Sequence, residues 1–141
     1  MKFYGGIDPG LNGGMAVVGE DGSLERFHKL VFDDDLPSGV VIRKFFSDCV
    51  GIAVEKQHIR PMQCGSATTM TNFGYLLGCL DSRHIQVSPV AWQKFIHGKP
   101  TKDKEKTAAY CRELFPDRLT NPISDGITDA IAIALWCRSI Y

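Results

Sequence analysis

The chain has 141 residues, 44% of them hydrophobic, and its 16 basic and 16 acidic residues give a formal net charge of zero. This length predicts one domain over residues 1–141, and no apolar run is long enough to predict a membrane-spanning helix. The five cysteines form no C-x-x-C pair, and the first residues lack the basic-then-apolar order of a secretory signal. We therefore expect a protein of a reducing, cytoplasmic compartment without membrane contact.

Residues 3–18 predict a β-hairpin. An apolar strand ends in Asp8, residues 9–13 form the loop, and apolar residues then resume. A carboxylate at the end of a buried strand is costly unless a cation or hydrogen bonds compensate it. Asp8 therefore either caps the turn through nearby backbone N–H groups or belongs to a charged site. Residues 23–32 alternate loosely and predict a third strand, which completes an antiparallel meander.

The middle of the chain predicts a helix and a buried strand. Three aspartates at residues 33–35 are interpreted as a solvated loop rather than a metal site. Residues 37–49 predict a helix that begins at a proline. Residues 50–56 are an apolar strand that ends in Glu55, and its continuous apolar character predicts burial on both faces. A polar loop is expected over residues 61–69.

A predicted helix over residues 71–80 carries an apolar stripe and, on a neighbouring face, Gly74 and Gly78. Glycine is unfavourable inside a helix, so this spacing suggests that another helix or a strand approaches closely. The stripe fits the subunit's own core and a subunit interface equally well. It consists of Phe73, Leu76, Leu77 and Leu80.

A basic segment over residues 94–106 follows a fifth predicted strand (84–89) and overlaps a short predicted helix (90–96). It leads into a helix over residues 103–115. Clustered lysines can follow a phosphate backbone, or they can be a solvated loop, and the spacing alone leaves both interpretations open. The lysines are Lys94, Lys99, Lys102, Lys104 and Lys106.

The last predicted helix starts after the N-cap Ser124 and runs to the C-terminus. Asp125 and Asp129 are four residues apart, so both carboxylates point to the same side of the helix. Asp125 suits the N-terminus of a helix, but Asp129 adjoins an apolar run. A metal ion between the two carboxylates would relieve their repulsion.

Two acids at strand ends and two acids on one helix face predict a site of four carboxylates. Oxygen ligands without histidine or cysteine select Mg²⁺ or Mn²⁺. Two such ions hold the attacking and leaving oxygens in a phosphodiester displacement. The residues that suit this chemistry are Asp8, Glu55, Asp125 and Asp129.

Several motifs together resemble the RuvC-type Holliday-junction resolvases, which belong to the ribonuclease H-like superfamily. They are GIDPG after the first strand, VEK at the end of another, and SDGITDAIAIA at the start of the last helix. The resemblance covers nearly the whole chain. It implies an α/β fold in which an antiparallel three-strand meander and then parallel strands form a mixed five-stranded sheet, with helices on both faces.

The same resemblance implies a Mg²⁺-dependent endodeoxyribonuclease, with Mn²⁺ as a substitute and two ions per active site. It implies a homodimer that cuts four-way junctions, and other branched DNA, by symmetric nicks. The helix over residues 71–80 is the best candidate for the dimer interface, and the alternative is that its apolar stripe packs into the subunit's own core. The short chain is similar to phage-type members, which implies a protein of the bacterial cytoplasm that a phage or its host encodes.

Residue by residue, the resemblance assigns metal binding to Asp8, Glu55 and Asp129. The fourth ligand is expected at Asp125, in a D-G-x-x-D spacing similar to that of phage-type members, because Gly126 occupies the position three before the final aspartate. Lys104 best matches the active-site lysine of the family, with neighbouring Lys102 and Lys106 as alternatives, and the basic segment is expected to contact DNA. The carboxylates alone do not distinguish substrates, so the alternative is a ribonuclease H-like nuclease that acts on RNA–DNA hybrid or structured RNA.

Overall fold

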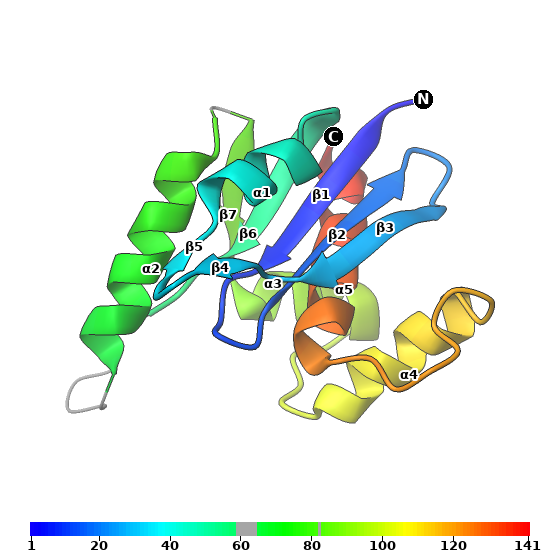
Figure 1. Ribbon diagram of the computed structural model, residues 1–141. Coiled ribbons are helices and arrows are strands. Elements are labelled where there is room, and N and C mark those ends of the chain that lie inside the picture. The colour runs from blue at the N-terminus through cyan, green and yellow to red at the C-terminus, as the bar shows by residue number, and fades with distance from the viewer. Residues whose placement is uncertain (59–64, 82) are drawn as a thin grey trace.

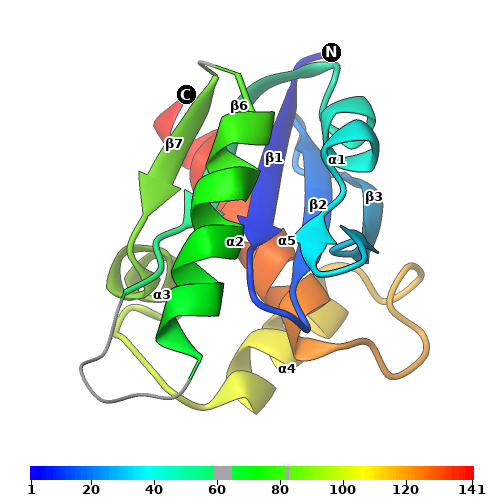
Figure 2. The same ribbon diagram turned by 60° about the vertical axis from the view of Figure 1, so that its left-hand side comes forward.

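The computed structural model describes residues 1–58, 65–81 and 83–141. One mixed five-stranded sheet in the order β3-β2-β1-β6-β7 forms its centre. Helices α1 and α2 cover one face, whereas α5 covers the other face and packs against α3 and α4 (Figures 1 and 2). This arrangement confirms the α/β fold, the sheet composition and the placement of helices on both faces that the sequence predicted.

The first three strands form the predicted antiparallel meander, and two parallel strands extend it. β1 pairs with β2 on one side and with β6 on the other, and β6 pairs with β7. Because β1 and β6 are parallel neighbours, their last residues lie at the same edge of the sheet. The strands are β1 (Phe3–Asp8), β2 (Gly14–Gly19), β3 (Leu24–Lys29), β6 (Cys49–Glu55) and β7 (His84–Val87).

Helix starts follow local capping signals. Before α1 and α3, the side chains of Ser38 and Ser88 accept hydrogen bonds from backbone N–H groups of the first turn, and Asp103 does so before α4. The helices are α1 (Gly39–Phe45), α2 (Ser66–Cys79), α3 (Pro89–His97), α4 (Lys104–Leu114) and α5 (Asp125–Ile140). In the described part of the chain, no helix is both long and apolar enough to cross a membrane.

The structure differs from the predicted elements at three places. Helix α2 begins at Ser66, so the second half of the predicted polar loop is helical, while residues 61–64 lie outside the described part. The acidic stretch at residues 33–35 lies within a small hairpin of β4 (Phe32–Asp33) and β5 (Leu36–Pro37). Helix α1 begins at Gly39 rather than at Pro37, which lies in β5, and it ends earlier than predicted, because the chain enters β6 at Cys49.

Helix α5 lies unusually close to the sheet. A Cβ atom built on Gly6 of β1 would lie 2.2 Å from the carbonyl oxygen of Ala130 and 2.3 Å from the nitrogen of Ala134. No side chain larger than hydrogen fits between these backbones, and the helix is buried over most of its length. Gly6 therefore sets the distance at which α5 crosses β1.

The apolar stripe of α2 packs within the subunit. Phe73, Leu76 and Leu80 are buried in the core between the sheet and helices α1 and α2, and Leu77 packs against that core. The hypothesis that this stripe forms a dimer interface is therefore wrong. The two helical glycines do not mark a close approach within the subunit either, because no atom lies within 4 Å of a Cβ built on Gly74 or Gly78.

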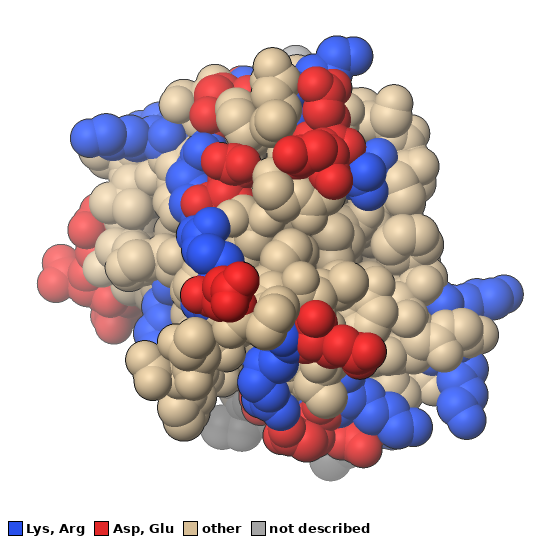
Figure 3. Space-filling view, turned by 90° about the vertical axis from the view of Figure 1, so that its right-hand side faces the viewer, with Lys and Arg blue, Asp and Glu red and all other residues tan. Residues whose placement is uncertain are grey.

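One side of the molecule carries mixed rather than concentrated surface charge (Figure 3). On the side of the molecule that carries β3 and α4, acidic and basic side chains alternate without an extended area of one sign (Figure 3). The chain as a whole is formally neutral. On this side, a polyanion would therefore be recognised by individually placed basic side chains rather than by a broad positive field.

Candidate active site

The fold brings the acidic ends of two strands and the first turns of α5 together. Asp8 ends β1 and Glu55 ends β6, one residue beyond the paired residues Ile7 and Val54. Asp129 lies in the second turn of α5, which crosses these strands. Asp8 and Asp129, which are more than 120 positions apart in the sequence, thus lie at the same edge of the sheet, as we predicted from the strand-end acids.

Contacts between glycines hold α5 against the loop that follows Asp8. Gly13 and Gly126 form an isolated parallel β-bridge. A Cβ atom on Gly14 would lie 2.4 Å from the carbonyl oxygen of Gly126, and one on Gly126 would lie 2.1 Å from the carbonyl oxygen of Asn12. The backbones touch directly, so the first turn of α5 has a fixed position relative to Asp8.

The carboxyl groups of this site bind protons more tightly than ordinary ones. Burial, and next the charge of Asp8, raises the pKa of Glu55 to about 7 and that of Asp129 to about 6. Burial also raises the pKa of Asp8, although the N–H group of Gly10 and the charge of Lys104 oppose it. Glu55 and Asp129 each respond to the charge of Asp8, so the three groups form one electrostatic cluster.

Hydrogen bonds orient two of these carboxylates. The indole Nε1–H of Trp92 donates to Oε2 of Glu55 at 2.6 Å, and Trp92 is only 2% exposed. The backbone N–H of Gly10 donates to Oδ1 of Asp8 at 3.1 Å. The sequence assigned no site role to Trp92, which lies 37 residues from Glu55 along the chain.

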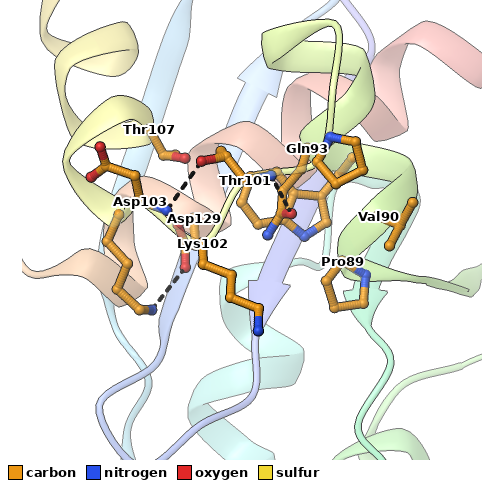
Figure 4. A pocket seen from close by; sticks show the side chains of 11 residues that line it. Pro89, Val90, Gln93, Thr101, Lys102, Asp103, Thr107 and Asp129 are labelled. Atoms are coloured by element: carbon orange, nitrogen blue, oxygen red, sulfur yellow. Dashed lines mark hydrogen bonds and ion pairs between the residues drawn. The ribbon is translucent and has the colours of Figure 1, made fainter.

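Lys104 is the lysine that reaches the acids. Its Nζ lies 3.5 Å from Oδ2 of Asp129 (the dashed line that reaches Asp129 in Figure 4). Partial burial lowers the pKa of Lys104, but the charges of Asp129, Asp8 and Asp125 outweigh this effect and raise it. Lys104 therefore stays protonated and compensates part of the negative charge.

Two hollows lie on either side of Lys104. One has a volume of about 650 Å³ and is lined by α3 and by the segment that leads into α4, with Lys102, Thr101 and Asp129 in its wall (Figure 4). The other has a volume of about 550 Å³ and is lined by Asp8, Lys29 and Asp125 among others. Lys104 lines both hollows.

The other predicted site residues occupy different positions. Asp125 is exposed and shares a hollow with Asp8, and its charge acts on Asp129 and Lys104. Three lysines of the basic segment, Lys94, Lys99 and Lys106, are exposed and line neither of these hollows. Lys29, which the sequence did not single out, does line one of them.

The donor atoms fit a hard divalent cation. All the acidic side chains offer oxygen atoms, and burial together with mutual repulsion disfavours their ionised forms, an energetic cost that a cation would remove. In residues 1–58, 65–81 and 83–141, no three acidic, histidine or cysteine side chains already stand close enough to share one ion.

Solved structures share this fold. RuvC of Thermus thermophilus has a TM-score of 0.71 and 20% identity, over 94% of this chain and 91% of that one. The same protein in complex with a Holliday junction substrate has a TM-score of 0.72 and 20% identity, over 96% of this chain and 92% of that one. The fowlpox virus Holliday junction resolvase has a TM-score of 0.55 and 14% identity, over 99% of both chains. No protein-family model and no curated protein sequence matches the chain.

Proposed function

We propose that this protein is a metal-dependent endonuclease that cuts four-way DNA junctions. The observation that carries the proposal is the cluster of Asp8, Glu55 and Asp129 at one edge of the sheet, with Lys104 beside it. The substrate comes from the comparisons, since T. thermophilus RuvC and the fowlpox virus resolvase each have a structure with Holliday junction DNA. Their similarity in fold extends over 94% and 99% of this chain, respectively.

The residues that would hold Mg²⁺ or Mn²⁺ are Asp8, Glu55 and Asp129, with Asp125 as a fourth ligand. Two bound ions would supply the charge that stabilises the attacking and leaving oxygens of a phosphodiester. Local hydrogen bonds orient two of these carboxylates for metal binding. Trp92 fixes one oxygen of Glu55, and the N–H of Gly10 fixes one oxygen of Asp8.

Lys104 has two roles in this proposal. In the free protein it offsets the repulsion within the acidic cluster through its ion pair with Asp129. With substrate present, its ammonium group can contact a phosphate oxygen, because it lines both hollows that flank the acids. The hollow with Lys102 in its wall offers a second basic contact for the DNA backbone.

We further propose that the protein acts as a homodimer. A single domain carries one cluster of this kind among its described residues, whereas a symmetric junction needs two matched nicks. A two-fold dimer places the same surface of each subunit at the interface. Sedimentation at micromolar concentration, with and without junction DNA, tests this part; a strict monomer on the junction would contradict it.

Cleavage assays test the proposed activity directly. The purified protein is incubated with Mg²⁺ and either a four-way junction, a flap, linear duplex or an RNA–DNA hybrid. We expect the junction to be cut fastest, and Asp8→Asn, Glu55→Gln and Asp129→Asn to abolish cutting while they retain junction binding. Asp117→Asn, at an exposed site outside the cluster, is the matched control and should cut normally. Preference for the hybrid would instead favour a ribonuclease H-like activity.

A further inference from the structure

One basic side chain at the candidate active site lies outside the predicted basic segment. Lys29 is the last residue of β3, is exposed, and lines the same hollow as Asp8 and Asp125. The basic segment of residues 94–106 contributes Lys104 to this hollow. Lys29 therefore approaches the acids from the antiparallel meander, whereas the segment approaches them from α4.

The backbone of Lys29 is held firmly. Lys29 pairs with Gly14 in the sheet, and the N–H of the next residue, Leu30, donates to the carbonyl oxygen of Gly13 at 3.0 Å. Gly13 in turn bridges to Gly126 at the start of α5. Three segments that carry Lys29, Asp8 and the helix acids are thus joined through backbone contacts.

Within the part of the chain that the structure describes, the ammonium group of Lys29 forms no ion pair. Among the ion pairs of the described residues, Lys104 pairs with Asp129, whereas Lys29 pairs with none of the acids. A cation beside an acidic site, on a fixed backbone and without an internal partner, remains available to an external anion.

A hydroxyl group in the wall of the same hollow is also without a partner. Ser124 precedes α5, but its side chain caps no backbone N–H, unlike the serines before α1 and α3. Its Oγ is buried and has no hydrogen-bond partner among the described residues. A change between staggered rotamers about χ1 is enough to turn such a hydroxyl towards a ligand.

From these observations we propose that Lys29 binds a backbone phosphate of the DNA strand that is cut, with the hydroxyl of Ser124 as a second donor. This inference rests on the proposed function and deepens it. The substrate strand runs from the hollow with Lys102, past Lys104 and the acids, to the hollow with Lys29. The acids thus lie between two basic contacts, and such a path needs no broad positive field, in agreement with the mixed charges on the side shown in Figure 3.

Salt dependence of binding tests the contact at Lys29. Binding of the full-length protein to a labelled four-way junction is measured by fluorescence anisotropy in EDTA over a series of salt concentrations. Loss of one phosphate contact should lower the magnitude of the slope of log affinity against log salt by about 0.9. We expect this for Lys29→Ala, and less for Lys29→Arg. The matched control is Lys2→Ala, because Lys2 is exposed and precedes β1, at the end of the strand away from Asp8. This variant should keep the wild-type slope.

Two further readouts separate binding from folding. Lys29→Ala should raise KM in Mg²⁺ with kcat retained and with an unchanged melting temperature, and Ser124→Ala should weaken binding in the same direction. If the wild-type protein binds and cuts junctions but the Lys29→Ala variant shows the same salt dependence of binding as the wild type, this inference alone is overturned. Wild-type protein that neither binds nor cuts branched DNA would overturn the proposed function and this inference with it.

Discussion

Replacement of Glu55 by glutamine should stabilise the metal-free protein at neutral pH, although it removes a proposed metal ligand. The carboxyl of Glu55 binds its proton more tightly in the folded chain, where burial raises its pKa to about 7, than in the unfolded chain. The stability that this proton contributes is fully present at low pH and is lost as the pH rises from about 4.5 to about 7. Glutamine carries no charge and avoids this loss.

The structure sets the size of the effect. The pKa of Glu55 rises from the ordinary 4.5 to about 7, and each pKa unit corresponds to about 1.4 kcal/mol, so the gain in unfolding free energy is at most about 3 kcal/mol. Glutamine keeps a side-chain oxygen that can accept the hydrogen bond from Trp92. For a domain of this size, the gain corresponds to a rise in melting temperature of about 10 °C.

Thermal unfolding in EDTA at about pH 8 and about pH 5 measures this effect. Glu55→Gln should melt well above the wild type at the higher pH, and most of the difference should disappear at the lower pH, where the wild-type carboxyl is already protonated. Glu113→Gln, at an exposed position of α4, controls for the loss of one acidic charge and should change little. An equal gain at both pH values, or none at the higher one, would refute the reasoning.

Four other outcomes are expected. Cleavage should require Mg²⁺ or Mn²⁺, with Ca²⁺ supporting little turnover, and persistence of cleavage in excess EDTA would contradict this. Trp92→Phe removes the donor to Glu55 and should raise the pKa of that carboxyl above about 7, which carbon NMR of the metal-free protein measures; an unchanged titration would show that the hydrogen bond has no effect. Gly126→Ala should destabilise the fold by several kcal/mol, because its Cβ would lie 2.1 Å from the carbonyl oxygen of Asn12. Gly78→Ala, with open space around it, should instead stabilise α2 by up to about 1 kcal/mol in urea unfolding.

The sequence predicted those site residues that a local pattern marks. Asp8 and Glu55 each end an apolar strand, and the parallel pairing of β1 with β6 then places them at one edge. Trp92 and Lys29 carry no comparable local signal. Trp92 acts through a partner 37 residues away, and Lys29 reaches the hollow only because β3 pairs beside β2. Both depend on tertiary pairing that hydrophobic periodicity does not encode.

The stripe on α2 shows a different limit of sequence patterns. Leucine and phenylalanine at helical spacing indicate that one face of a helix is buried, but they do not indicate what buries it. Phe73, Leu76 and Leu80 turn out to pack under the subunit's own sheet. Gly74 and Gly78, which suggested a close approach, instead face open space. A glycine in a helix therefore marks a close contact only when a neighbouring backbone is known to lie there.

Gly126 is such a case, and it accounts for the spacing of the helix acids. Its Cα faces the backbone of Asn12 and Gly13 so closely that a side chain of any size would collide with it. A chain with this contact cannot carry an acid at position 126. Asp125 is the neighbouring position whose side chain is exposed, and it lines the same hollow as Asp8. The backbone contact that docks α5 against the loop after β1 therefore requires glycine at position 126 and leaves Asp125 as the exposed acid beside it.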